Sequence, residues 1–207
     1  MEPIDQLAHV LPALSALVHD IDPAQLDDPT PCDHFAVRDV LDHMMVLGGT
    51  ISYLFRGEEP PTIEAPPPTG TVPSAPFRTT MTGLLDAVCS EGALERTIVS
   101  PVGAMPGSDF ARLVAFDGLI HGWDLATATG LRYEPPETLV AAVDDFARAA
   151  ITADFRDGET FKDETTPPEG ASRLERLVAF SGRTVRTPSL ATSTTTPSND
   201  PTNITKG

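Results

Sequence analysis

Apolar residues recur at intervals of three and four residues along much of this chain, and this spacing most constrains its fold. In the first such segment Ile4, Leu7, Leu11, Leu14 and Val18 fall on one face of a helix. Clusters of proline and glycine, which end helices, separate the segments. We therefore predict an all-α chain with helices at residues 4–19, 37–55, 77–90 and 108–129, a fifth opened by Pro135 and Pro136, and a short sixth between Ser172 and Gly182.

The helices are predicted to form one domain, residues 1–186, because a chain of this size fits a single core. Residues 20–35 connect two helices, and residues 58–76, with seven prolines, form an irregular connection long enough for a flap or crossover. Residues 187–207 are rich in Thr, Ser, Pro and Asn and hold hardly any large apolar residue. We expect this tail to be disordered, because burial cannot offset its ordering entropy.

The composition excludes several classes of partner. The formal net charge is −16 at pH 7, and the Lys and Arg clusters that bind nucleic acid or membrane surfaces are missing from the sequence. Apolar runs are shorter than the roughly 18 to 20 residues of a spanning helix, and the acidic N-terminus is unlike a secretory signal. Cys32 and Cys89 are too few for a disulfide framework and are expected to act as small apolar residues. We expect a cytoplasmic protein.

The helix predicted at residues 108–129 carries two ionisable residues in an otherwise apolar row. Asp117 and His121 lie one turn apart on the face that also holds Phe110 and Val114. A carboxylate and an imidazole at this spacing can reach one metal ion, as the paired histidines of helical zinc sites do. His43, mid-helix in the row of Ala36, Val40, Leu47, Thr50 and Leu54, is expected to point toward the core and is the candidate third ligand.

Three protein ligands leave a coordination position open, as in catalytic metal sites. The spacing alone favours a structural interpretation, in which Asp117 and His121 form a hydrogen-bonded core pair and His43 is a satisfied buried histidine. In the functional interpretation, Asp124 accepts a hydrogen bond from a ligand histidine and Trp123 lies nearby. In the structural one, Trp123 anchors packing and Asp124 is a helix-surface or loop-tying carboxylate.

Arg38 is either a plain surface residue or, near the mouth of the site, a binder of a substrate carboxylate. Gly118 and Gly122, four residues apart, are predicted to let a neighbouring helix approach closely. Ser108 is the predicted N-cap of the helix that carries Asp117 and His121.

Three separated segments resemble the mycothiol-dependent maleylpyruvate isomerase metal-binding family. They are T-P-C-D-H-F-A-V-R-D-V-L-D-H from Thr30 to His43, D-G-L-I-H-G-W-D-L-A-T-A-T-G from Asp117 to Gly130, and the closing segment A-S-R-L-E-R-L-V-A-F-S-G-R. The resemblance implies a DinB-like four-helix bundle with additional short helices. It also implies a divalent metal, usually zinc, on His43, Asp117 and His121, and mycothiol or another low-molecular-weight thiol as co-substrate.

The chain departs from the family pattern at three positions. Phe35 stands where the family commonly has Trp, and Ala36 stands where a Thr could cap the helix. Asp117 takes a position that is Glu in the isomerase, which shortens this ligand by one methylene and can change the metal geometry. The isomerase also has a C-terminal domain that contributes to its active site, so we expect a reaction other than maleylpyruvate isomerisation.

These observations predict a metal-dependent thiol transferase or isomerase that acts on a small electrophilic substrate. The alternative is a non-catalytic bundle that binds metal or a small ligand as a sensor, carrier or interaction subunit, because no further nucleophile or general base stands out. A third interpretation is a metal-free site in which a water or hydrogen bond joins the two histidines. Substrate identity and oligomeric state stay open, with a homodimer as one outcome. Twelve of the fourteen basic residues are Arg, a bias typical of a GC-rich, for example actinobacterial, source.

Overall fold

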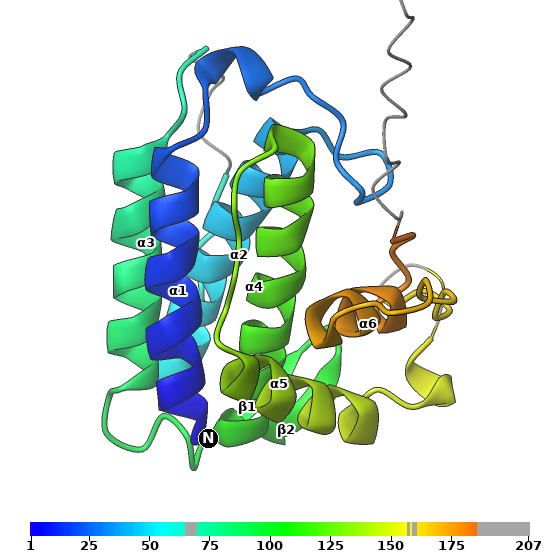
Figure 1. Ribbon diagram of the computed structural model, residues 1–207. Helices are drawn as coiled ribbons and strands as arrows, with labels where there is room; N and C mark the ends of the chain where they lie inside the picture. The colour runs from blue at the N-terminus through cyan, green and yellow to red at the C-terminus, as the bar shows by residue number, and fades with distance from the viewer. Residues whose placement is uncertain (65–69, 157, 159–160, 186–207) are drawn as a thin grey trace, which may run out of the picture.

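A computed structural model describes residues 1–64, 70–156, 158 and 161–185 (Figure 1). The predicted disordered tail, residues 187–207, lies outside the described residues. The described elements are α1 (Pro3–His19), η1 (Pro23–Gln25), α2 (Val37–Arg56), α3 (Ser74–Val88), β1 (Thr97–Ser100), β2 (Gly103–Pro106), α4 (Gly107–Thr129), α5 (Glu137–Ala150), η2 (Ala153–Phe155) and α6 (Arg173–Phe180). Helices dominate, which confirms the predicted all-α class.

The four long helices pack along one another, and the two last helices lie across their side. α1 packs against α3 and α4, and α2 packs against the same two helices from the other side (Figure 1). α5 contacts α4 and α6, and α6 in turn contacts α4. None of the helices in the described part of the chain is both long and apolar enough to cross a lipid bilayer.

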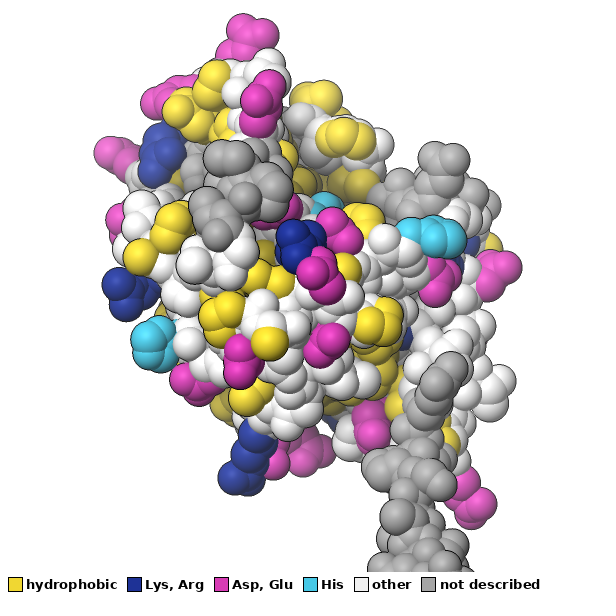
Figure 2. Space-filling view, turned by 90° about the horizontal axis from the view of Figure 1, so that it is seen from above, with side chains coloured by type: hydrophobic (Ala, Val, Ile, Leu, Met, Phe, Trp, Pro, Cys, Tyr) yellow, Lys and Arg dark blue, Asp and Glu magenta, His cyan; other side chains and the backbone are white. Residues whose placement is uncertain are grey.

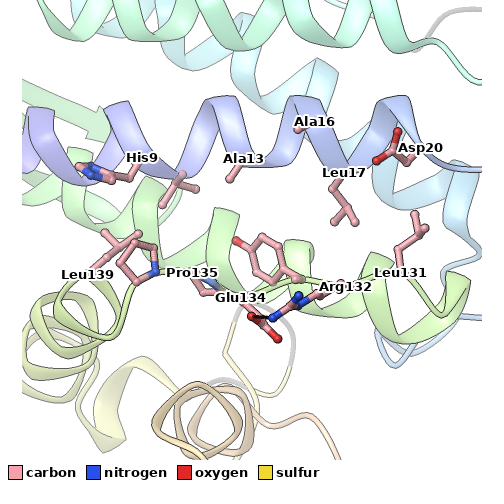
Figure 3. Close-up of a pocket in the computed structure, with 13 residues that line it drawn as sticks. His9, Ala13, Ala16, Leu17, Asp20, Leu131, Arg132, Glu134, Pro135 and Leu139 are labelled. Carbon is pink, nitrogen blue, oxygen red and sulfur yellow. Dashed lines mark hydrogen bonds and ion pairs between the residues drawn. The ribbon is translucent and has the colours of Figure 1, made fainter.

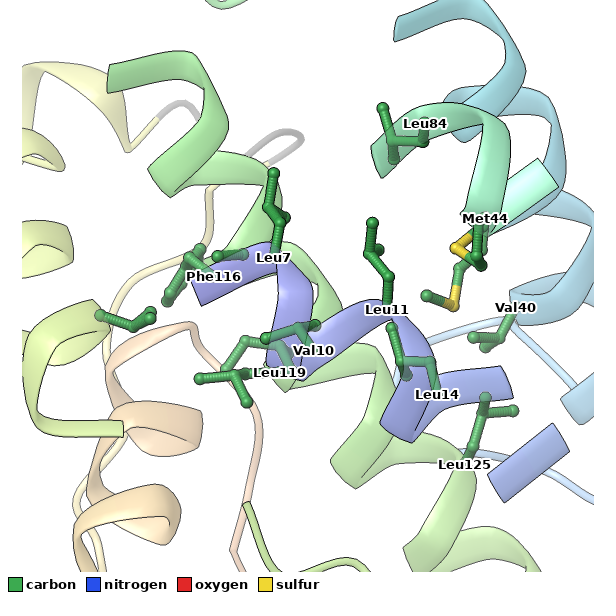
Figure 4. Packing of buried hydrophobic residues seen from close by; sticks show 14 of the residues in the cluster. Leu7, Val10, Leu11, Leu14, Val40, Met44, Leu84, Phe116, Leu119 and Leu125 are labelled. Atoms are coloured by element: carbon green, nitrogen blue, oxygen red, sulfur yellow. The ribbon is translucent and has the colours of Figure 1, made fainter. Parts of the chain in front are cut away.

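The core lies between these helices and is centred on α1. The leucines of α1 face α3 on one side of the helix, and α2 and α4 on its other sides (Figure 4). Pro12 lies on the exposed side of α1, away from these contacts. The residues of the core that Figure 4 labels are Leu7, Val10, Leu11, Leu14, Val40, Met44, Leu84, Phe116, Leu119 and Leu125.

Acidic side chains are scattered over the end of the molecule that lies at the top of Figure 1, without forming one patch. Figure 2, which views the molecule from the top of Figure 1, shows them spread over this end among fewer basic side chains. This distribution accords with the formal charge of −16.

The segment before α4 forms a short antiparallel hairpin. Thr97 pairs with Pro106, and Ser100 with Gly103. The turn before the hairpin also sets the start of α4, because the amides of Gly107 and Ser108 donate to the carbonyls of Arg96 and Leu94. The prediction that Ser108 caps this helix is therefore wrong: Gly107 is already helical, and Pro106 precedes it without a side-chain cap.

The predicted inward row of α2 needs a correction. The buried face includes Val37, Leu41 and Met44, and α2 packs on α3 and α4. His43 and Leu47 are half-buried and line a cavity instead of entering the core. One side of α2 thus faces the core and another faces the cavity. A single predicted row of residues could not distinguish these two sides.

Other helix boundaries agree with the sequence to within a few residues. α2 ends at Gly57, which adopts a left-handed conformation with φ of 74°. Although Ala36 offers no side-chain cap, Asp39 accepts a hydrogen bond from its amide at 2.8 Å. Ser172 and Glu175 form the predicted capping box of α6. α3 begins at Ser74, three residues before the predicted start.

Gly118 allows the close approach of α1 and α4, as predicted, whereas Gly122 makes room for the ring of Tyr133. A Cβ atom at Gly118 would lie 2.6 Å from Val10 Cγ1 and 3.3 Å from Leu14 Cδ1. Both side chains are buried, so they have little room to move.

We predict that Gly118→Ala lowers the free energy of unfolding. Overpacking a core costs about 1 to 3 kcal/mol, which exceeds the roughly 1 kcal/mol that alanine gains over glycine in a helix. Gly83→Ala in α3 is the matched control, because a Cβ there meets nothing within 4 Å. The control should be more stable than the wild type in urea denaturation, and equal stabilisation by both variants would contradict this packing account.

Candidate metal centre and its cavity

A cavity of about 1150 Å³ runs between α2 and α4. The hairpin turn closes one end, and the connection before α2 and the segment after α6 close the other. It is lined by residues that include Pro29, Thr30, Cys32, Asp33, Phe35, His43, Leu47, Ile51, Pro101, Val102, Phe110, Leu113, Val114, Asp117, His121, Trp123, Thr127, Lys162 and Arg183.

His43, Asp117 and His121 meet in the middle of this cavity. The helical turn of α4 places Asp117 Oδ1 3.5 Å from His121 Nε2. The His43 ring of α2 stands edge-on to the His121 ring, with 5.1 Å between their centroids. One ligand-type atom from each of the three residues lies within 4.8 Å of the others. Atoms that bind one tetrahedral zinc at about 2.1 Å are about 3.4 Å apart, so small side-chain rotations would bring all three onto one ion.

Asp124 fixes the orientation of the His121 ring. Its Oδ2 lies 3.1 Å from His121 Nδ1, and the residue is fully buried. With Nδ1–H donating to this carboxylate, Nε2 is the nitrogen that faces Asp117 and is available to a metal. The predicted alternative that Asp124 lies on the helix surface is wrong, because the residue is buried. Asp124 does tie a loop to α4, because Arg183 Nη2 donates to the same oxygen at 3.1 Å.

The electrostatics of the site follow from this arrangement. Burial alone would lower the pKa of His121, but the charge and hydrogen bond of Asp117, together with Asp124, outweigh it and raise that pKa to about 9. Burial alone would raise the pKa of Asp117, but His121 outweighs it and lowers that pKa to about 2. Burial lowers the pKa of His43. In the metal-free protein at neutral pH, His121 is therefore cationic, and a metal must displace its proton.

Arg183 is the residue of the site that sequence reasoning missed. Besides Asp124, its Nη2 donates to Cys32 Sγ at 3.3 Å, so one guanidinium joins the segment after α6 to the connection before α2. The signal was present in the sequence, since Arg183 is the last residue of the third family-like segment. Cys32, expected to be only a small apolar residue, is half-buried on the cavity wall, and burial raises its pKa.

Cys32 forms a second group of ligand-type atoms with His121 and Asp124, again within 4.8 Å of one another. This group is less suited to an ion, because the Arg183 guanidinium already bonds to both Cys32 and Asp124. A cation there would have to replace this arginine. The His43, Asp117 and His121 group contains no such basic residue.

The structure brings Trp123 to the cavity but not Arg38. Trp123 is half-buried on the wall and packs against the core. Arg38 forms an ion pair with Asp27 and does not line the cavity. Phe35, at the position where the family has Trp, packs against His43 with 5.9 Å between ring centroids.

A smaller hollow of about 450 Å³ lies between α1 and the connection from α4 to α5 (Figure 3). Of its ionisable side chains, Tyr133 is half-buried, whereas His9, Asp20, Arg132 and Glu134 are exposed, and Arg132 and Glu134 pair with each other. Because none of these side chains is held by a buried partner, this hollow is a weaker candidate site than the large cavity.

We predict that the metal-free protein loses stability as the pH rises from 6.5 through 9. The pKa of His121 is raised from 6.5 to about 9, so its ion pair with Asp117 stabilises the fold fully below pH 6.5 and is lost above pH 9. The free energy of unfolding, measured with chelator present, should fall by about 1 to 3 kcal/mol over this range. His121→Gln should remove this dependence, and His9→Gln, on the exposed face of α1, should keep it. If the free energy of unfolding depended on pH in the same way in the wild type and in His121→Gln, the ion pair would be refuted.

Comparison with known proteins agrees with the fold. The family model described as the mycothiol maleylpyruvate isomerase N-terminal domain matches residues 7–126. Two uncharacterized proteins of Mycobacterium tuberculosis, from strains CDC 1551 and H37Rv, are each 32% identical to this chain over 187 residues, which cover 90% of this chain and 100% of theirs.

Two solved structures share the fold. They are the mycothiol-dependent maleylpyruvate isomerase, with a TM-score of 0.50 and 16% identity, and its histidine-to-alanine variant, with a TM-score of 0.53 and 15% identity. Each comparison covers 69% of this chain and 66% of the isomerase chain, just under two thirds of its length. The extent of the family match and the identity to the mycobacterial proteins show that this chain belongs to the mycothiol maleylpyruvate isomerase N-terminal domain family.

Proposed function

We propose that this protein is a metal-dependent thiol transferase or isomerase that joins a low-molecular-weight thiol of the mycothiol type to a small electrophilic substrate. A divalent ion, most simply zinc, is held by His43, Asp117 and His121. The observation that carries this proposal is the convergence of these three ligand atoms from two helices within one cavity. Membership of the mycothiol-related family supports the choice of thiol.

The residues present fit such an ion. Two imidazoles and one carboxylate are a donor set that zinc accepts, and the cavity leaves room for a further ligand. An ion bound there lowers the pKa of a thiol or water that takes the open position. The shorter Asp117 still reaches the site, because it lies one turn from His121 with its side chain 38% exposed and lining the cavity.

The charges of the surrounding residues suit an anionic ligand. With His121 neutral on the metal, the two carboxylates of Asp117 and Asp124 compensate a divalent ion. Arg183 then leaves one positive charge unbalanced. A thiolate of single negative charge would neutralise it.

Each side chain near the centre has a separate task in this proposal. Asp124 holds His121 Nδ1–H and so keeps Nε2 free for the ion. Arg183 holds Asp124 in place. Phe35 packs on the His43 ring and limits access of water to it.

A second candidate is a non-catalytic bundle that binds metal or a small ligand. It is favoured by one observation: apart from the three ligands, the ionisable side chains of the described cavity wall already have partners. Asp33 pairs with Lys162, Cys32 bonds to Arg183, and Glu175 caps α6. Such a protein would bind electrophiles saturably without turnover, in the presence or absence of thiol.

We predict that protein purified without chelator contains one equivalent of a divalent metal, and that His43→Ala and His121→Ala lose it. Each variant removes one of only three protein ligands. Mycothiol-dependent consumption of electrophiles should fall together with the metal content. His9→Ala, which changes an exposed histidine of α1, is the control and should keep both. Unchanged metal content in either ligand variant, measured by elemental analysis, would rule out this site.

We predict that Asp124→Asn weakens metal binding by about 10 to 100-fold although it removes no ligand. The amide can donate to His121 Nδ1, and the ring would then present a protonated Nε2 to the ion. The metal affinity is measured by competition with a chromogenic chelator. Asp109→Asn, in the first turn of the same helix and with its side chain 44% exposed, is the matched control. Equal affinities in the two variants would show that Asp124 does not orient the ligand.

A further inference from the structure

The cavity extends past the metal centre in two directions along α4. α2 and α4 are antiparallel at this wall, because His43 lies beside His121 and Phe55 lies beside Phe110, with 5.8 Å between the phenylalanine centroids. Residues before Asp117 on α4 therefore face residues after His43 on α2. The two directions carry different side chains.

The direction toward the hairpin is apolar, and we name this part the apolar arm. It is lined by Leu47, Ile51, Phe110, Leu113 and Val114. Pro101, Val102 and Ser100 of the hairpin turn close it, and the Ser100 hydroxyl already donates to the Gly103 carbonyl. Of the charged residues that line the cavity apart from Asp117, Asp33, Lys162 and Arg183 belong to the opposite direction, and the Glu175 carboxylate is engaged in capping α6.

The opposite direction is polar, and we name this part the polar arm. It is lined by Cys32, Asp33, Thr127, Lys162 and Arg183. Its hydrogen-bonding and charged groups suit the sugar and amide groups of a mycothiol-type thiol. A thiol bound there with its sulfur at the metal centre leaves the apolar arm to the second substrate.

We propose that the second substrate is an uncharged, elongated, apolar electrophile whose reactive carbon lies at the metal centre and whose tail fills the apolar arm. This inference rests on the proposed function and specifies its substrate class. The seven residue steps from Phe110 to Asp117 span roughly 10 Å of helix, which sets the length of the tail. A carboxylate in this arm would lose its hydration without gaining a partner, so short dicarboxylates are disfavoured.

The chemical step balances without an oxidant. For an α,β-unsaturated aldehyde, the thiol sulfur forms a bond to the β-carbon and the thiol proton ends on the α-carbon. The carbon–carbon double bond becomes single, and no group leaves. The apolar tail takes no part in this step and contributes binding alone.

The test is the binding of linear alcohols, from butanol to decanol, to the zinc-loaded full chain by isothermal titration calorimetry. The dissociation constant should fall about fourfold for each added methylene, the value for complete burial of that group, and should level off once the arm is full. A dissociation constant that does not change with chain length overturns the proposal.

Two variants locate the effect. Leu113→Lys places a charge in the half-buried wall of the apolar arm and should weaken octanol binding about tenfold or more. Val99→Lys, at a side chain of the hairpin that is 71% exposed and does not line the cavity, should bind as the wild type does. If octanol binding is weakened equally in both variants, or in neither of them, the alcohols bind outside the apolar arm and the proposal is overturned.

The alcohol series needs neither thiol nor turnover, so it separates this inference from the proposed function. A protein that binds no metal but keeps the chain-length dependence contradicts the proposed reaction and supports the apolar arm. Metal binding and thiol-dependent turnover that favour maleate over the long 2-alkenals support the reaction and overturn the substrate class.

Discussion

The candidate site depends on one buried histidine held between two carboxylates. The Nδ1–H of His121 donates to Asp124, and Nε2 faces Asp117, while Arg183 compensates the charge of Asp124. A buried histidine with a single carboxylate would be a plain ion pair. Because the second carboxylate, Asp124, anchors Nδ1 of the ring, Nε2 is left to bind a metal. For this reason we propose that the cluster is a metal centre.

The fold supplies two supports for this arrangement. α1 packs closely on α4 at Gly118, which fixes the helix that carries both Asp117 and His121. α2 carries the core on one face and His43 on another, so the third ligand is positioned by packing that is independent of the site. Arg183 then connects the segment after α6 to the centre, so the end of the described chain contributes to a site built mainly by α2 and α4.

Much of the fold could be predicted from the sequence, because apolar periodicity, the proline clusters and Gly57, Gly130 and Gly182 mark the helices and their ends. Asp117 and His121 could be paired because their spacing within one helix is local. The role of Arg183 could not be derived from spacing, since it approaches Asp124 across 59 residues of sequence. The same limit applies to Cys32, to the start of α4 at Gly107 and to the two-sided burial of α2, which depend on tertiary contacts.

X-ray absorption spectroscopy at the zinc edge of the metal-loaded protein tests the central claim most directly. In thiol-free protein we predict that the zinc ion has two imidazole nitrogens and carboxylate or water oxygens at about 2.0 to 2.2 Å, and no sulfur. When a low-molecular-weight thiol is added, a sulfur should appear at about 2.3 Å from the zinc. A sulfur ligand in thiol-free protein would assign the ion to the group that contains Cys32. Such a result would contradict a centre built on His43, Asp117 and His121.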